Sequence, residues 1–167
     1  MKTLVIFYSR TGTTRKLAQE ISKNLKCNIE EIFDTKNRQG LFGYLRSGRD
    51  AMSKRFTRIK PITKNPSKYD FIIIGTPVWV GTMSTPIRTY LYENRNNFKK
   101  IAFFCTLGGS GAEKTFRDME NICNKKPIAT LQLRTKEVKN NTYSEKLKEF
   151  INKLHWNLCK FKKDLIS

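Results

Sequence analysis

Apolar runs and amphipathic stretches alternate along the whole chain. Short apolar runs of strand length predict β-strands, and a continuous run of isoleucines marks the third strand as a central, buried one. The five predicted strands span residues 3–8, 28–34, 69–75, 101–106 and 128–134. Apolar residues at helical spacing predict helices at 13–26, from Pro86 to about 96, at 113–123 and around 143–154.

Five strands alternating with helices predict an α/β fold. We expect a five-stranded parallel sheet with helices on both of its faces. With 167 residues, the chain is long enough to form a single domain with a full core. In this architecture ligands bind at the carboxyl ends of the strands, where the strand order changes direction.

Two segments fall outside this alternation. Residues 36–60 form a basic, insertion-like segment, in which a short amphipathic helix is expected to break or fray at Gly48. Its apolar residues are Leu41, Phe42, Leu45 and Met52. The segment either covers one edge of the core or serves as a lid or docking surface. Residues 156–167 form a basic amphipathic tail, for which we favour packing on the domain or a homodimer contact over a weak contact with anionic membrane.

The stretch at residues 9–14 lies between the first predicted strand and the first predicted helix. It reads Ser9-Arg10-Thr11-Gly12-Thr13-Thr14. A helix N-terminus presents backbone N–H groups to an anion, and hydroxyl groups can donate to phosphate oxygens as well. Gly12 lets the backbone turn tightly beside a ligand. The stretch therefore predicts a phosphate site.

The alternative interpretation of residues 9–14 is an ordinary turn in which a threonine caps the helix. Other phosphate loops are excluded by spacing. The chain lacks both the G-x-x-x-x-G-K-[ST] pattern of triphosphate loops and the G-x-G-x-x-G pattern of dinucleotide sites.

Two more loops leave the carboxyl ends of predicted strands, at residues 76–84 and 106–111. Together with residues 9–14 they are rich in Gly, Ser and Thr, and they contain no Asp or Glu. One of them carries Trp79, which we expect to stack on a ligand ring rather than to lie in the core. A phosphate loop, an aromatic loop and a glycine loop around one crevice suit a planar phosphorylated cofactor.

The chain is strongly basic, with 33 Lys and Arg against 14 Asp and Glu and a net charge of +19. Such a field attracts nucleic acids, anionic lipids and acidic proteins without specificity. Because no known nucleic-acid recognition module accompanies the charge, we expect no specific nucleic-acid binding. A protein partner is expected to present an acidic surface.

Metal-binding and hydrolytic residues are sparse. The four cysteines lack CxxC spacing and His155 is the only histidine, so we expect no metal site. Ala112 breaks the G-x-S-x-G pattern around Ser110, which argues against a serine hydrolase. A response-regulator phospho-acceptor is excluded because Thr76 stands where an Asp is required.

No signal peptide and no apolar stretch of membrane-spanning length is evident in the sequence. We therefore expect a cytoplasmic protein without a transmembrane segment.

With three such loops in order, the chain resembles the flavodoxin family. Residues 9–14 match the family's [ST]-x-T-G-x-T phosphate loop, and residues 75–79 and 106–111 match the loops after its third and fourth strands. The resemblance covers about residues 2–155. It implies a flavodoxin-like three-layer sandwich with strand order 2-1-3-4-5 and a non-covalently bound FMN.

The resemblance also implies which residues bind this cofactor. The phosphate would be held by Ser9, Arg10, Thr11, Gly12, Thr13 and Thr14. The isoalloxazine would be held by Thr76, Pro77, Val78, Trp79, Val80, Gly81, Thr106, Leu107, Gly108, Gly109 and Gly111. No catalytic acid, base or nucleophile is implied, because the flavin carries the chemistry.

This chain departs from the family in two ways. Electron-shuttling flavodoxins are typically acidic, and many place a second aromatic residue in the third loop, where Leu107 stands here. One flavin face would thus be open, or covered by Phe42, Tyr44 or Phe56 of the basic segment.

The acid-free loops bear on the redox properties. Arg10, Arg88 and Lys114 near the site would favour the anionic, fully reduced flavin, so we expect a less negative hydroquinone couple than in acidic flavodoxins. The Val80–Gly81 peptide is expected to turn as the redox state changes, because glycine tolerates both orientations.

Three functions remain open. The first is an FMN protein that transfers electrons between redox partners. The second is an FMN-dependent oxidoreductase of the NAD(P)H:quinone or protoporphyrinogen type, with a small-molecule electron acceptor. The third is a binding module without flavin that uses its basic surface.

Overall fold

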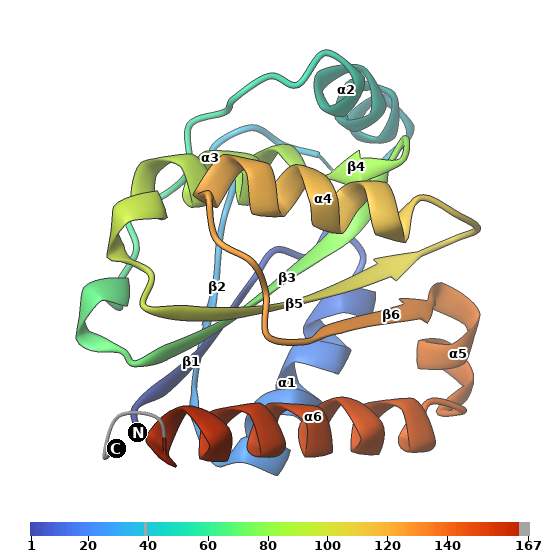
Figure 1. The fold of residues 1–167 in the computed structure, drawn as a ribbon. Coiled ribbons are helices and arrows are strands. Elements are labelled where there is room, and N and C mark those ends of the chain that lie inside the picture. The colour runs from blue at the N-terminus through green and yellow to red at the C-terminus, as the bar shows by residue number, and fades with distance from the viewer. Residues whose placement is uncertain (39, 164–167) are drawn as a thin grey trace.

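The computed structural model describes residues 1–38 and 40–163, which fold around one twisted sheet (Figure 1). Its parallel strands lie in the order β2-β1-β3-β5-β6, and a short β4 pairs antiparallel with the end of β3. The strands are β1 (Thr3–Phe7), β2 (Asn28–Glu31), β3 (Phe71–Trp79), β4 (Thr82–Met83), β5 (Lys100–Leu107) and β6 (Thr130–Arg134). Apart from the β3–β4 hairpin this is the predicted order, so the predicted α/β fold is confirmed.

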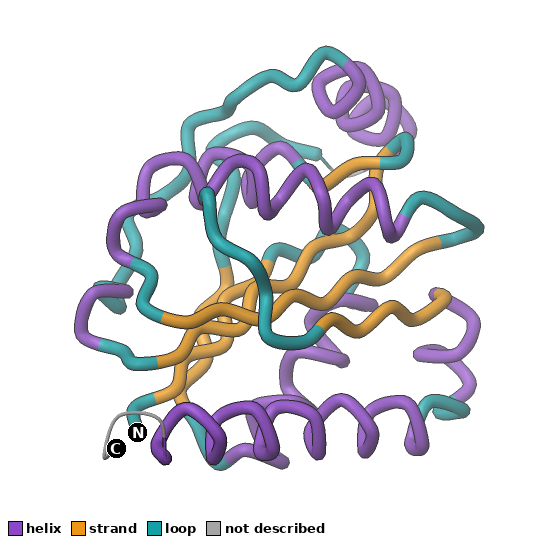
Figure 2. Tube along the Cα trace, in the orientation of Figure 1, coloured by secondary structure: helices purple, strands orange, loops and turns teal. Residues whose placement is uncertain are grey.

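Helices cover both faces of the sheet (Figures 1 and 2). One face carries α1 (Thr13–Leu25), α5 (Thr135–Asn140) and α6 (Ser144–Lys163). The other face carries α3 (Thr85–Asn94) and α4 (Ala112–Cys123), with α2 (Gly40–Met52) placed further out. Short 3₁₀ turns lie at Pro66–Lys68 and Arg95–Asn97.

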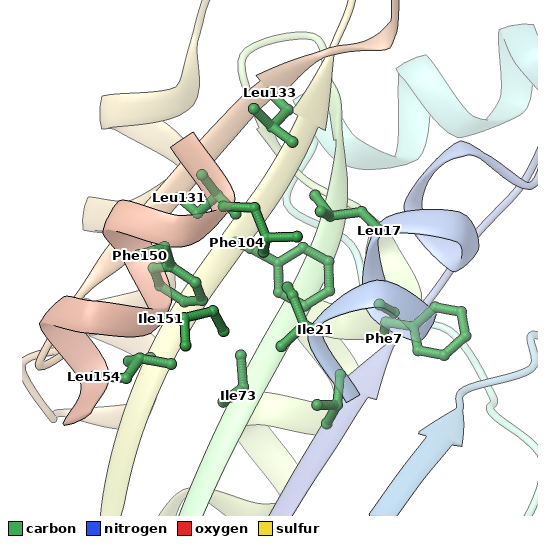
Figure 3. Close-up of a cluster of buried hydrophobic side chains, with 14 of the residues drawn as sticks. Phe7, Leu17, Ile21, Ile73, Phe104, Leu131, Leu133, Phe150, Ile151 and Leu154 are labelled. Carbon is green, nitrogen blue, oxygen red and sulfur yellow. The ribbon is translucent and has the colours of Figure 1, made fainter. Parts of the chain in front are cut away.

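The core under α1 and α6 shows how closely the layers pack (Figure 3). Leu17 of α1 and Phe150 of α6 both pack on the sheet around Phe104. A Cβ at Gly75 would lie 1.9 Å from the Phe104 ring, so only glycine fits opposite this phenylalanine. On the other face, α3 and α4 bury a second cluster that includes Trp79 and Tyr90.

Two predicted strand ends are wrong, and one helix was missed. The second strand ends at Glu31 rather than at residue 34, and Asp34 instead forms an isolated antiparallel bridge with Ile59. The third strand continues to Trp79 because Thr76 and Pro77 still pair with β5. The predicted loop at 76–84 is therefore mostly a β-hairpin. Helix α5 was not expected, since six residues carry too little periodicity to be detected.

The basic segment does form a helix, but Gly48 neither breaks nor frays α2, which is continuous from Gly40 to Met52. The predicted contacts of Leu41 and Tyr44 lie outside the described side chains. The tail is not a separate segment either. Helix α6 continues without a break to Lys163, and Trp156 is 74% exposed. The side chains of residues 158–163 and the whole of residues 164–167 lie outside the described part of the chain, so packing of the tail or a homodimer contact stays a prediction. Within residues 1–38 and 40–163, no helix has both the length and the apolar character needed to cross a membrane.

Candidate functional site

The loop between β1 and α1 places a helix N-terminus at the carboxyl edge of the sheet. Gly12 directly precedes α1 with a φ of 89°, a left-handed conformation that glycine adopts without strain. Its amide donates to the Ser9 hydroxyl over 3.1 Å. No described side chain caps α1, so the alternative of a threonine-capped helix start is wrong. The first amides of α1 therefore face a site where an anion can accept from them.

A crevice of about 450 Å³ brings the three loops together. Its lining combines threonine hydroxyls, one indole and two cations. The lining residues are Arg10, Thr11, Thr13, Thr14, Pro77, Val78, Trp79, Thr106, Leu107, Gly108, Thr135 and Lys139. Thr135 and Lys139 were missed at the sequence level because they belong to α5.

Two hydroxyl contacts fix the loops relative to one another. Thr14 and Thr106, both nearly inaccessible to solvent, hold their Oγ1 atoms 2.7 Å apart. The Thr135 hydroxyl donates to the Leu107 carbonyl over 3.3 Å. The crevice is thus held in shape by hydrogen bonds between its own walls.

Seven residues expected at the site lie near the crevice without lining it. They are Ser9, Gly12, Thr76, Val80, Gly81, Gly109 and Gly111. Thr76 is fully buried, and its hydroxyl oxygen accepts from the Ser84 amide over 2.9 Å, so it supports the hairpin instead. Gly109 and Gly111 line an adjacent cavity of about 750 Å³.

Trp79 ends β3 with its indole held on two sides. The Tyr8 ring meets it edge-on, with 5.5 Å between the ring centroids. The Arg38 guanidinium lies over the indole, 5.5 Å from the ring centroid. Burial raises the pKa of Tyr8 to about 12, so this phenol stays neutral at physiological pH. Trp79 is only 8% exposed and belongs to the buried cluster under α3 and α4, so the expectation that it lies outside the core is wrong. The part of its indole that lines the crevice is the part a ligand ring can meet.

Arg38, which contacts Trp79 beside the crevice, is a further residue that sequence reasoning missed. It is 3% exposed and donates from Nε to Asp34 and from Nη1 to Asp50, the latter over 3.1 Å. Thr57 adds a hydroxyl donated to Asp34 over 2.9 Å. This network ties α2 to the sheet beside Trp79. The available signal was that Asp50 is the only acid in the otherwise basic stretch 36–60.

The β3–β4 turn carries backbone strain. Val80 has a φ of 49° and Gly81 a φ of 72°, the pair of left-handed residues that a type I′ hairpin turn requires. A β-branched residue in this region is a genuine outlier. The third loop ends against this turn, because a Cβ at Gly111 would lie 2.7 Å from the Gly81 Cα.

Two of the three cations expected near the site lie elsewhere. Arg88 is buried under β4, where its Nη2 donates to the Thr82 hydroxyl over 3.0 Å, and burial lowers its pKa. Lys114 faces Asp118 of the same helix, with its Nζ 3.8 Å from the carboxylate. Only Arg10 lines the crevice, where Lys139 joins it.

The crevice offers binding groups without a proton-transfer or nucleophilic apparatus. Its described lining contains no Asp, Glu, His or Cys. Across the described ranges, no group of three or more such residues lies close enough together to hold a metal ion. The arrangement can therefore bind an anion and a flat ring, but any chemistry must come from the ligand.

Comparisons with known proteins agree with this geometry. The family model described as Flavodoxin matches residues 2–154. A flavoprotein from Lactobacillus acidophilus in complex with FMN is similar at 26% identity, covering 86% of this chain and 98% of that one, with a TM-score of 0.70. No curated protein matches.

More distant solved structures share the fold alone. An oxidised flavodoxin 1 from Bacillus cereus is 16% identical, covers 93% of this chain and 98% of its own, and gives a TM-score of 0.55. A flavone reductase, also 16% identical, covers 89% of this chain and 59% of its own, with a TM-score of 0.55.

Proposed function

Because this chain belongs to the flavodoxin family, we propose that it binds FMN non-covalently in the crevice and transfers electrons between redox partners in the cytoplasm. One observation carries the proposal. Three loops from separate parts of the chain form one crevice that holds hydroxyls, an indole and two cations but no carboxylate. A dianionic phosphate joined to a planar ring has the chemistry that such a lining accepts.

The phosphate end of the crevice fits FMN best at the start of α1. Thr11, Thr13 and Thr14 line it with hydroxyl groups, and the first amides of α1 add backbone donors with the helix dipole behind them. Gly12 has open space where a Cβ would project, so the backbone can approach a ligand closely. Arg10 supplies a positive charge at the same end.

The ring end fits the isoalloxazine. Trp79 and Val78 provide apolar surface, and Gly108 in the third loop leaves backbone groups accessible to the ring's polar edge. FMN, when bound, supplies the redox chemistry, because its ring accepts and releases electrons. The chain's own residues bind it, orient it and exclude water from one of its faces.

A second candidate function is an FMN-dependent reductase that takes electrons from NAD(P)H. The cavity of about 750 Å³ beside the glycine loop favours it, because this cavity shares Leu107 with the crevice. Its lining includes the cations Lys114, Arg117, Arg134, Lys136 and Lys146. A phosphorylated donor such as a nicotinamide dinucleotide would find complementary charge there.

Visible absorption of the purified protein with added FMN tests the first proposal. We expect FMN to bind with perturbed flavin bands. Riboflavin, which lacks the phosphate, should bind about tenfold or more weakly, because hydrogen bonds to a charged group contribute about 1.5–3 kcal/mol. Thr13→Val should weaken FMN binding more than riboflavin binding. Thr130→Val, on an exposed position of β6, is the matched control.

The outcomes separate the three functions. Equal affinity for FMN and riboflavin would contradict a phosphate site at α1. Steady-state oxidation of NAD(P)H with a soluble quinone would favour the reductase over the electron carrier. A protein that takes up no flavin at all would instead be a binding module that uses its basic surface.

A further inference from the structure

Among the side chains of helix α2 that the structure describes, the buried ones are small or polar. They are Gly43, Ser47, Asp50 and Ala51. Three larger apolar side chains of the helix are instead exposed: Phe42 is 87% exposed, Leu45 59% and Met52 68%. An amphipathic helix normally buries such residues. Of the two roles that the sequence left open for this segment, the exposure of Phe42, Leu45 and Met52 favours a docking surface over cover for the core.

The orientation of α2 is fixed by specific contacts. A Cβ at Gly43 would lie 2.2 Å from the carbonyl carbon of Arg38, so only glycine allows this close approach. The Ser47 hydroxyl donates to the Gly43 carbonyl over 2.7 Å. Asp50 is held by the buried guanidinium of Arg38. Turning the helix to bury Phe42 would break that ion pair, which leaves the apolar residues outward.

Helical spacing places Phe42, Leu45 and Met52 on one face of α2, and these residues together with the exposed ring pair Phe56 and Tyr92 are here named the α2 patch. Phe56 is 52% exposed and Tyr92 48% exposed, and their ring centroids lie 5.0 Å apart. Figure 1 shows α2 as the outermost helix on its side of the molecule. Exposed apolar residues that share a face in this way mark interaction sites.

The segment that supplies most of the α2 patch is strongly basic, and the exposed Glu93 beside Tyr92 is an acid at the edge of the patch. Residues 36–60 contain eight Lys and Arg and one acid, Asp50, whose side chain is only 5% exposed. The Arg49 and Arg55 side chains are 65% and 58% exposed. A basic surface needs a partner of opposite charge. An anionic lipid headgroup layer supplies that charge over a whole surface, and the acyl chains below it accept the apolar side chains.

We propose that the α2 patch docks this protein on an anionic membrane surface. Phe42, Leu45 and Met52 enter the boundary between headgroups and acyl chains. The neighbouring arginines meet lipid phosphates, as in other helices that lie in a membrane interface. The cytoplasmic leaflet carries the anionic lipid that this requires.

Docking in this orientation places one end of the redox crevice near the membrane. Gly48 of α2 lies against the β3–β4 turn, since a Cβ there would be 3.3 Å from Val80 Cγ2. Val80 is itself 60% exposed. The inference does not depend on FMN, so vesicle binding and flavin binding can succeed or fail separately.

Flotation with lipid vesicles tests the proposal. We expect binding to vesicles with equal amounts of phosphatidylcholine and phosphatidylglycerol, and weak binding to phosphatidylcholine alone. The double variant Phe42→Ser/Leu45→Ser should reduce binding about tenfold or more, because each apolar side chain loses its burial. The control Phe33→Ser/Trp156→Ser removes two exposed apolar residues outside the patch and should leave binding unchanged.

Charge needs its own control, because the net charge of +19 attracts anionic vesicles to any face. Arg46→Gln/Arg49→Gln should weaken binding more than Lys126→Gln/Lys148→Gln, which removes the same charge from exposed positions elsewhere. Equal losses would overturn the proposal, since attraction would then be nonspecific. Circular dichroism checks that every variant is folded.

A tryptophan reporter identifies the face that meets the lipid. Phe42→Trp in a Trp156→Phe background should shift its emission to the blue on vesicle binding. The native Trp156, which lies on α6 across the sheet, should not shift in the wild type (Figure 1). Absence of vesicle binding would overturn the proposal. A concentration-dependent dimer abolished by Phe42→Ser would also overturn it and assign the patch to a second copy of the chain.

Discussion

Thr14 of α1 and Thr106 of β5 meet hydroxyl to hydroxyl, with 2.7 Å between their Oγ1 atoms, although 92 positions separate them in the sequence. Both side chains are almost fully buried, and both residues line the crevice. This contact holds the first loop against the third. Two loops of the proposed cofactor site are therefore joined by a hydrogen bond between the chain's own side chains.

The Thr14–Thr106 contact predicts non-additive stability. Thr106→Val should lower the free energy of unfolding by about 1–3 kcal/mol, because the Thr14 hydroxyl stays buried without a partner. The double variant Thr14→Val/Thr106→Val should recover part of that loss, since both hydroxyls are gone. Urea unfolding of the wild type, both single variants and the double variant gives the four unfolding free energies of this double-mutant cycle. Simple additivity would contradict a direct hydroxyl contact.

Arg38 is expected to be the most sensitive residue of the basic segment. Arg38→Met removes the buried cation that pairs with Asp34 and Asp50, which should cost about 3–5 kcal/mol of unfolding free energy. Asp50 keeps only the longer contacts to Arg49 and Arg55, at 3.8 and 3.9 Å, among the described residues. Arg49→Met on the same helix should change stability by less than about 0.5 kcal/mol, because the Arg49 side chain is 65% exposed. Denaturant unfolding compares the two. Similar losses would show that the buried network does not anchor α2.

The β3–β4 turn predicts opposite effects for neighbouring substitutions. Val80→Asn should raise stability by about 1 kcal/mol, because asparagine tolerates the φ of 49° better than valine. Gly81→Ala should lower stability by about 1 kcal/mol, because Gly81 has a φ of 72°. Thermal unfolding measures both changes. If the Val80–Gly81 peptide turns with redox state, Gly81→Ala should also shift the flavin potentials, and unchanged potentials would count against that turning.

The buried Tyr90 predicts that the stability of the fold depends on pH in the alkaline range. Its hydroxyl is buried without a hydrogen-bond partner among the described residues, and burial raises its pKa above the ordinary 10.0. A raised folded-state pKa gives stability that is present below pH 10 and is lost as the pH rises beyond it, because the unfolded chain releases the proton first.

Tyr90→Phe removes this titration. The variant should be about 1 kcal/mol more stable at neutral pH, because an unsatisfied hydroxyl is removed, and its stability should fall less steeply above pH 10. Unfolding free energies measured from pH 7 to 11 check both. Tyr69→Phe is the control, because the Tyr69 hydroxyl accepts from Asn28 over 3.0 Å at the surface. Equal alkaline slopes for Tyr90→Phe and the wild type would contradict the assignment.

The crevice charge predicts the redox behaviour of the FMN-loaded protein. Arg10 and Lys139 favour the anionic reduced flavin, so we expect a less negative hydroquinone couple than in acidic flavodoxins. Arg10→Gln should make it more negative by tens of millivolts, since a tenfold change in relative binding shifts a one-electron couple by about 59 mV. Potentiometric titration measures this, with Lys148→Gln as a distant control. A wild-type value as low as that of acidic flavodoxins would contradict the expectation.

Local patterns in the sequence were enough to predict the fold and the main loops of the site. The isoleucine run of β3 and the apolar spacing of α1 depend only on near neighbours, so they predict the sheet layers before any contact is known. Residues 9–14 combine a glycine with hydroxyls between a strand and a helix, which predicts the turn chemistry. Parallel topology then brings all three loops to one edge of the sheet.

The sequence did not predict contacts that depend on distant partners. Thr76 looked like a cofactor ligand but bonds to Ser84 within the hairpin. Arg88 looked like a site cation but lies buried against Thr82. In each case the residue type correctly suggested a hydrogen-bonding side chain. Its partner depends on how β3 folds back into β4 and on how α3 packs, and neither can be read from neighbouring residues.

Helix α2 separates most clearly what the local sequence determines from what the tertiary structure decides. By itself, the sequence determined that this segment carries an amphipathic helical pattern and which side chains share a face, because helical periodicity is local. It wrongly predicted a break at Gly48. Only the tertiary structure decided which face turns inward. Gly43 permits a backbone contact with Arg38, and burying Asp50 with Arg38 leaves Phe42, Leu45 and Met52 on the outside. Hydrophobicity alone would favour the opposite orientation, and the buried ion pair and the close backbone approach outweigh it.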